Sequence, residues 1–201
     1  MVRKRKRIKI ILASASPRRK LLLSGLLNNF GLKFVVKPAN IAEHIPEKIA
    51  DYGKFAANLA YEKAVSVAKK SDGIVIAADT IVVYRRKVMG KPADRDDAVR
   101  MLMYLSGNEH AVYTGLVILD TGSGKCYKVF EVTKVKFRKI LNPEIQYYTD
   151  TKSPYDKAGA YGIQDDFGST FVESLKGDYF NVVGLPIVKT YLGLQKFMKL
   201  I

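Results

Sequence analysis

The sequence predicts an α/β protein in which one sheet is flanked by helices. In the first half of the chain, apolar runs of strand length alternate with segments of helical periodicity, and in the second half two long extended segments are joined by a glycine-containing turn. The chain has 201 residues, of which 48% are hydrophobic, enough to bury one substantial core. We therefore expect residues 1–201 to form a single domain that carries a basic N-terminal arm, residues 1–7.

The first half of the chain is predicted to open with a β-α-β unit. This unit comprises a strand at 8–13, a helix at 17–27 and a second short strand at 34–37. Residues 40–48 are polar and contain a proline, which indicates a loop. The next helix covers residues 52–69, because its apolar residues fall on one stripe.

The second half is predicted to contain paired strands and further helices. Apolar runs at 73–78 and 81–84 are separated by Asp79 and Thr80, so a carboxylate interrupts an expected core strand. The remaining elements, in order, are a helix capped by Asp94 and ending at Gly107, strands at 111–119 and 127–140, a short helix at 143–149, a loop at 156–168, strands at 170–172 and 181–183, and a helix at 186–200.

The turn between the first strand and the first helix gathers hydroxyls and cations. Ser16 is a natural N-cap, and Pro17 suits the first helical position, where a missing N–H costs nothing. The free N–H groups of this helix would face the same volume as the Ser14 hydroxyl and the guanidinium of Arg18 or Arg19, as a polyphosphate requires. These residues alone leave two interpretations open, a phosphate site or a capped helix with solvated arginines.

Composition excludes several classes of protein. No stretch approaches the roughly 20 apolar residues of a membrane span, so we expect no membrane partner and a cytoplasmic location. A lone cysteine, Cys126, excludes an internal disulfide and a cysteine-based zinc cluster. The formal net charge is +15, and six of the cations lie between Arg3 and Lys9. Such a field attracts either nucleic acid, through weak nonspecific contact of the basic arm, or a small polyanion.

Asp79 is the strongest candidate for chemistry. A carboxylate at the end of an apolar run must be paired, metal-bound or shifted in pKa if it is buried, although it could also cap a turn or pair with a lysine for structural reasons. Together with Glu43, it could hold a divalent cation through oxygen ligands. The two histidines, His44 and His110, are too few for a zinc site. Five cations would together neutralise a triphosphate, namely Arg18, Arg19, Lys63, Lys91 and Lys157.

Several motifs in register along the chain carry a family resemblance. They are Ser14-Ala15-Ser16-Pro17-Arg18-Arg19, Leu59-Ala60-Tyr61-Glu62-Lys63-Ala64, Ala78-Asp79-Thr80, Gly90-Lys91-Pro92, Asp156-Lys157-Ala158-Gly159-Ala160-Tyr161-Gly162-Ile163-Gln164 and Gly184-Leu185-Pro186. In this order the chain resembles the Maf family of nucleoside triphosphate pyrophosphatases, from about Ile8 to the C-terminal helix. The resemblance implies a Maf/ITPase-like fold, which is a long mixed sheet flanked by helices with a cleft between two lobes.

The resemblance also implies an activity, the hydrolysis of a nucleoside triphosphate to the monophosphate and pyrophosphate. By position, Asp79 is the proton acceptor, and Glu43 and Asp79 would bind a divalent metal cation, Mg, Mn or Co. The implied substrate-binding residues are Ser14, Arg18, Arg19, Lys63, Thr80, Lys91 and Gln164. Three of these, Arg18, Thr80 and Gln164, match the branch of the family that acts on dTTP and UTP, and the Gln164 amide could read the O4 and N3–H edge of the base. A homodimer is implied as well.

The chain departs from the family pattern at two places. Asn108-Glu109 replaces an Arg-Thr pair, and Asp165-Asp166-Phe167 replaces a small, glycine-rich turn beside Gln164, where the carboxylates could retune base recognition or face solvent. Two alternative functions remain open at this stage. One is a pyrophosphatase for modified or noncanonical nucleotides, and the other is a nucleic-acid-binding regulator of cell division.

Overall fold

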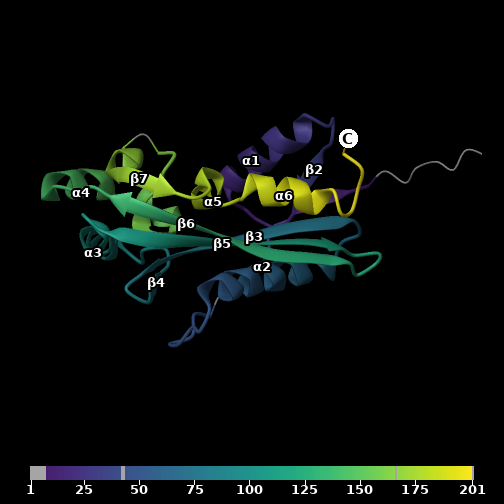
Figure 1. Cartoon of the computed structure of the whole chain (residues 1–201), viewed down its shortest axis with the longest axis horizontal. Helices are drawn as coiled ribbons and strands as arrows, with labels where there is room; N and C mark the ends of the chain where they lie inside the picture. Colours follow the sequence, from purple (N-terminus) through teal and green to yellow (C-terminus); the bar gives the residue numbers. More distant parts are fainter. Residues whose placement is uncertain (1–7, 42–43, 166, 201) are drawn as a thin grey trace, which may run out of the picture.

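The protein forms one mixed sheet of seven strands with helices on both faces (Figure 1). The computed structural model describes residues 8–41, 44–165 and 167–200, so the predicted basic arm at 1–7 lies outside the described residues. The strands are β1 (Ile10–Leu12), β2 (Phe34–Val36), β3 (Ile74–Tyr84), β4 (Lys87–Met89), β5 (Glu109–Asp120), β6 (Cys126–Phe137) and β7 (Val172–Lys176). The helices are α1 (Pro17–Asn28), α2 (Tyr52–Ala68), α3 (Arg95–Leu105), α4 (Asn142–Thr149), α5 (Tyr179–Val183) and α6 (Ile187–Leu194), with short 3-10 turns η1 (Pro154–Asp156), η2 (Ala158–Ala160) and η3 (Gly168–Phe171).

The sheet has the order β2-β1-β3-β5-β6-β7, with β4 paired to β3 outside this path. The predicted β-α-β opening is confirmed, since β1 lies parallel to both β2 and β3. From β3 onward the long strands pair antiparallel with one another. The expected α/β class and long mixed sheet are therefore confirmed.

Side chains of β3 alternate between two differently covered faces. Val75 and Ile81 pack against α2, which runs along one face of the sheet, whereas Ile76 points to the opposite face, where α1 and α6 lie (Figure 1). Val82 points to that face too, and it belongs to the cluster that contains the buried residues of α3. This alternation follows from the two-residue period of a strand. Because β3 is covered on both faces, it is apolar along most of its length.

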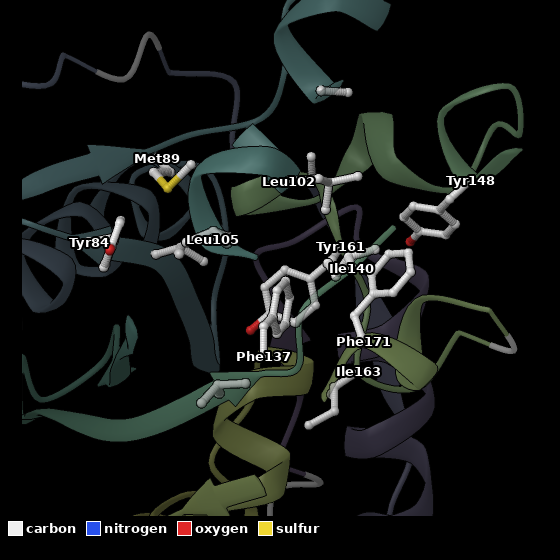
Figure 2. Packing of buried hydrophobic residues seen from close by; sticks show 14 of the residues in the cluster. Tyr84, Met89, Leu102, Leu105, Phe137, Ile140, Tyr148, Tyr161, Ile163 and Phe171 are labelled. Atoms are coloured by element: carbon white, nitrogen blue, oxygen red, sulfur yellow. The ribbon is translucent and has the colours of Figure 1, made fainter. Parts of the chain in front are cut away.

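On the face opposite α2, the core divides into two clusters, and each is the centre of one lobe. The first cluster joins β1 to α1 and α6. The second joins β4, α3 and α4 and is rich in aromatic rings, among which Phe137 and Tyr161 meet edge to face at 4.7 Å between centroids (Figure 2). Strands β3 and β5 contribute to both clusters, so the two lobes share one sheet.

One edge of β3 is left open between the lobes. On that edge β1 pairs with residues 74–76 and β4 with residues 82–84, and within the described parts of the chain no strand pairs with 77–81 there. On the other edge β5 pairs with every residue from Ile74 to Val83. Asp79 and Thr80 lie in the middle of this gap. The prediction that Asp79 interrupts a strand is therefore wrong, because the ladder with β5 carries the strand straight through it.

Three further predictions differ from the structure. The strand predicted at 170–172 is displaced, because Gly168–Phe171 form the turn η3 and β7 begins at Val172. Residues 181–183 belong to helix α5 rather than a strand, because Asp178 caps a short turn by accepting a hydrogen bond from the Phe180 N–H at 2.8 Å. The last helix ends at Leu194, and the apolar residues beyond it reach the first cluster from turns instead.

Strand β4 was not predicted. Its hairpin with β3 turns through Arg85 and Arg86, which have φ values of 46° and 65°. Two positive φ values suit a tight hairpin turn that is usually marked by Asn-Gly, so an Arg-Arg pair carries no sequence signal for it.

Candidate active site

A cavity of about 520 Å³ opens at the gap in the sheet. It is bounded by the N-terminus of α1, the middle of β3, the end of β4, the η1–η2 segment and α5. Its lining includes most of the predicted site residues, namely Arg18, Arg19, Lys63, Asp79, Thr80, Lys91 and Gln164. The expected cleft between two lobes thus corresponds to this cavity.

The turn before α1 is built as the sequence predicts. Ser16 caps the helix by accepting a hydrogen bond from the Arg19 N–H at 3.4 Å, and Pro17 occupies the first helical position. Ser14 is buried and accepts hydrogen bonds from the Ser16 N–H and the Arg19 guanidinium, both at 3.2 Å. Ser14 therefore stands behind the cavity wall and reaches the site through Arg19.

Arg19 spans the two lobes through three hydrogen bonds. Its guanidinium donates to the Gly184 carbonyl at 2.9 Å, to Ser14 Oγ and to Thr80 Oγ1 at 3.0 Å. Thr114 donates its only hydroxyl proton to the Asn181 carbonyl at 2.9 Å, so in the 2.9 Å contact between the two threonines Thr80 is the donor. The Thr80 hydroxyl thus donates its proton to Thr114 and accepts a hydrogen bond from Arg19.

Asp79 lies on the opposite face of β3 from Thr80, toward α2. Its carboxylate forms an ion pair with Lys63 of α2, and both side chains are largely buried. Gly115 stands directly across the ladder from Asp79, and a Cβ at that position would lie only 2.1 Å from the Ala56 carbonyl oxygen. Only glycine at this point lets α2 pack so close to the sheet, which brings Lys63 within reach of Asp79.

A second cluster of charges faces the cavity from η1. Arg18 donates to the Asp156 carboxylate at 2.8 Å and to its carbonyl at 3.2 Å, and the buried Lys157 contacts the same carboxylate at 2.7 Å. Partial burial acts to raise the pKa of Asp156, but the hydrogen bonds from Lys157 and Arg18 outweigh it, so the pKa is lowered. Asp156 is therefore held as a carboxylate between two cations.

Gln164 and Lys91 complete the lining from the second lobe. Gln164 donates a hydrogen bond to Asp165 at 2.9 Å. The carbonyl of Gly90 accepts from the Gly159 N–H at 3.0 Å, which ties the segment before Lys91 to the turn that carries Lys157. Two of the residues raised by sequence, Glu43 and Asp166, lie outside the described residues.

The described residues offer few protein ligands for a divalent cation. Among them, no group of three or more His, Cys, Asp or Glu side chains is positioned to hold a metal. Mg²⁺ is commonly bound by one or two carboxylates together with substrate phosphates, and Asp79 in the cavity wall offers such a carboxylate. The donor set is therefore suited to a cation that arrives with a phosphate ligand.

Sequence reasoning missed several residues around the cavity. Asp156 was quoted within a motif but given no role, although it pairs with Arg18, and the carbonyl of Gly184 gives no sequence signal because it acts through the backbone. Tyr161 also lines the cavity, and its hydroxyl meets His110 Nε2 at 2.8 Å. His110 is buried and its pKa is lowered to about 4 by desolvation, so its ring is neutral at physiological pH.

Comparison with known proteins shows extensive similarity along most of the chain. A family model described as "Maf-like protein" matches residues 9–197. A dTTP/UTP pyrophosphatase of Thermoanaerobacter sp. (strain X514) is 50% identical over 186 residues, which is 92% of this chain and 94% of the relative. The dTTP/UTP pyrophosphatase of Desulforamulus reducens is 44% identical over 189 residues, or 94% of this chain and 96% of the relative.

Structural comparison finds a more distant similarity. A nucleoside-triphosphatase (dITP/XTP pyrophosphatase) from Mycobacterium abscessus is 16% identical, with a TM-score of 0.48 over 96% of this chain and 98% of the other. In the described part of the chain, no helix has the length and apolarity needed to cross a membrane. The family match over residues 9–197 and the identity of up to 50% to relatives of nearly equal length show that the chain belongs to the Maf family.

Proposed function

We propose that this protein hydrolyses dTTP and UTP to the nucleoside monophosphate and pyrophosphate. One observation carries the proposal: a single cavity gathers the Asp79 carboxylate with several cations, in a chain that is up to 50% identical to proteins named dTTP/UTP pyrophosphatase. The cations suit a triphosphate, and the carboxylate suits activation of water.

In this mechanism the cations hold the phosphates and fix the direction of attack. Lys91, Lys157 and the two arginines of α1 line the cavity and would neutralise the charge of the triphosphate. Positioning the α-phosphorus in line with the attacking water is worth a large fraction of the barrier in phosphoryl chemistry. Arg19 is held rigid by Gly184, so it would contribute a fixed rather than a mobile charge.

Asp79 would accept the proton of the attacking water. Its ion pair with Lys63 would orient the carboxylate toward the attacking water. When bound, a divalent cation would be held by Asp79 and by phosphate oxygens, and it would stabilise the negative charge of the leaving pyrophosphate. Glu43 is proposed as the second protein ligand.

Base selection is assigned to Gln164, Thr80 and Arg18. Gln164 lines the cavity, and its side-chain amide would offer both a donor and an acceptor to a pyrimidine edge. Thr80 would act by holding Arg19, because its proton is already donated to Thr114. When substrate binds, the Arg18 guanidinium would contact the nucleotide, either in place of Asp156 or in addition to it.

The proposal is tested by measuring pyrophosphate and orthophosphate separately with a panel of nucleoside triphosphates and Mg²⁺, Mn²⁺ or Co²⁺. Release of pyrophosphate, with dTTP and UTP as the best substrates, is the expected result. Release of orthophosphate would contradict cleavage between the α and β phosphates. Higher kcat/KM for 5-substituted pyrimidine triphosphates would favour the alternative of a pyrophosphatase for modified nucleotides.

The remaining assignments stay predictions. The homodimer is tested by the mass of the protein in solution, and the cytoplasmic location by fractionation of cells. Nucleic-acid contact through residues 1–7 predicts binding that weakens steeply with salt and is lost when these residues are deleted, with hydrolysis unchanged.

A further inference from the structure

We propose that Asp165 is a positioning residue that fixes the orientation of the Gln164 side-chain amide, so that the site selects uracil and thymine over cytosine. The inference deepens the proposed function and rests on it. It starts from a departure that the sequence singled out, since Asp165 belongs to the acidic segment that follows Gln164.

Asp165 does not face solvent but lies at the centre of a polar cluster behind the cavity wall. Its side chain is 16% exposed. One carboxylate oxygen, Oδ2, accepts hydrogen bonds from Tyr148 Oη at 3.0 Å and from Ser153 Oγ, and it lies 3.2 Å from Lys157 Nζ. The other oxygen, Oδ1, accepts from Gln164 Nε2 at 2.9 Å. The contacts at Oδ2 therefore fix the carboxylate, and Oδ1 in turn holds the amide of Gln164.

Two glycines leave the space that this cluster occupies. A Cβ on Gly162 would lie 2.4 Å from the carboxyl carbon of Asp165, and a Cβ on Gly168 would lie 2.7 Å from Tyr148 Oη. Neither contact is tolerable for a side chain packed against fixed groups. The backbone on both sides of Gln164 is thus shaped around the Asp165 carboxylate.

The chemistry of a carboxylate decides which way the amide points. An ionised carboxylate only accepts hydrogen bonds, so Gln164 must turn its nitrogen, and not its oxygen, toward Asp165. One N–H is then fixed on Asp165. Since Gln164 lines the cavity, the proposal gives the second N–H and the carbonyl oxygen to the base. Rotating the amide by half a turn would exchange the donor and the acceptor.

This orientation matters because uracil and cytosine present opposite patterns. Uracil and thymine carry an acceptor at O4 beside a donor at N3, whereas cytosine carries a donor at N4 beside an acceptor at N3. An amide that is free to turn can match either pattern, but an amide fixed by Asp165 matches only one. Asp165 would therefore act on base selection without touching the base.

The test is the ratio of kcat/KM for UTP to that for CTP, measured by pyrophosphate release. Asp165→Asn replaces the acceptor-only group with one that can also donate, so both orientations of Gln164 become available. We expect the ratio to fall about tenfold, the change that corresponds to about 1.4 kcal/mol. The ratio of dTTP to dCTP should fall in parallel. If Asp165→Asn melts below the assay temperature, Asp165→Ser is measured in its place, because it also removes the carboxylate.

Tyr148→Phe is the matched control. It removes a hydrogen bond from the same carboxylate at Oδ2 but leaves the contact between Oδ1 and Gln164. We expect a lower Tm and an unchanged ratio. A merely structural role for Asp165 predicts instead that Asp165→Asn lowers turnover of every nucleotide equally and leaves the ratio as it was, which would overturn the inference alone. Wild-type protein that releases no pyrophosphate from UTP or dTTP would overturn the proposed function itself.

Discussion

Lys63 on α2 and Asp79 on β3 form an ion pair that joins the helix to the centre of the sheet at the cavity wall. The lysine side chain is 13% exposed and the aspartate side chain 7%, so the pair is screened from bulk water. The close packing of α2 against the sheet fixes the cation beside the carboxylate. The site thus holds an ion-paired carboxylate within an otherwise largely apolar strand.

Replacing Asp79 is expected to remove catalysis. Asp79→Asn keeps the size of the side chain but cannot accept a proton from water, so kcat should fall by about 10²- to 10⁴-fold on every substrate. Pyrophosphate release under saturating substrate measures the effect. Asp96→Asn, at an exposed position in the first turn of α3, is the control and should keep wild-type turnover. Turnover that survives Asp79→Asn would contradict the assignment of the base.

The two arginines of α1 are expected to differ. Arg19→Ala removes three hydrogen bonds that tie α1 to Ser14, Thr80 and Gly184, so it should lower both Tm and kcat/KM for all triphosphates, the latter by about tenfold or more. Arg18→Ala removes the contacts with the Asp156 carboxylate and carbonyl and should change the preference among nucleotides.

The nucleotide panel and a thermal melt distinguish these outcomes. Arg100→Ala is a suitable control, because Arg100 is exposed on α3 and its guanidinium pairs with Asp97 of the same helix. Equal losses on every nucleotide in both α1 variants would show that the proposed division of roles is wrong.

Removal of divalent cations is expected to stop turnover without unfolding the protein. Treatment with EDTA should reduce pyrophosphate release by about 100-fold or more, because several kcal/mol of charge stabilisation is lost, and Mg²⁺, Mn²⁺ or Co²⁺ should restore it. The Tm with and without EDTA serves as the control, since the described residues form no structural metal cluster. Full activity in EDTA would contradict a divalent cofactor.

The stability of the protein is expected to fall between about pH 6.5 and pH 4 because of His110. Burial lowers the pKa of this ring to about 4, so the unfolded chain binds a proton across this range while the folded protein does not. The contribution is complete above pH 6.5 and is lost as the pH falls, by up to about 3 kcal/mol.

Urea unfolding at a series of pH values measures this dependence. His110→Gln can still hydrogen-bond Tyr161 but does not titrate, so its free energy of unfolding should change less than that of the wild type over the same range. Below about pH 4.5, Glu144 adds a further loss in both proteins, because its hydrogen bonds with Arg138 lower its pKa to about 2. Equal slopes for the two proteins above that pH would contradict the role of His110.

Local signals in the sequence predicted much of this fold. Ser16 and Pro17 marked the start of α1, and Asp94 marked that of α3, because caps depend on one or two residues. Errors arose where tertiary contacts override local pattern. The ladder with β5 holds Asp79 inside a strand, and Arg85 and Arg86 make a turn that other residues usually make.

The sequence predicted which residues line most of the candidate site, but not the contacts that hold these residues in place. Most of the residues identified from the family motifs line one cavity, although Ser14 lies behind its wall, and the partners that hold them follow from folding alone. Arg18 reaches Asp156 across 138 positions of sequence, and Arg19 reaches the backbone of Gly184 across 165. Such contacts depend on how the lobes meet, so periodicity and propensity do not contain them.

Because successive side chains of β3 point to opposite faces of the sheet, the number of residues in this strand is constrained. Adding or deleting one residue between Ile74 and Asp79 would turn Asp79 toward Arg19 and Thr80 toward Lys63. Ten residue pairs with β5 hold the strand in its present register against such a slip. We therefore expect natural variation in length to collect in the surface turns, while the count of residues along β3 stays constant in any descendant that retains this chemistry.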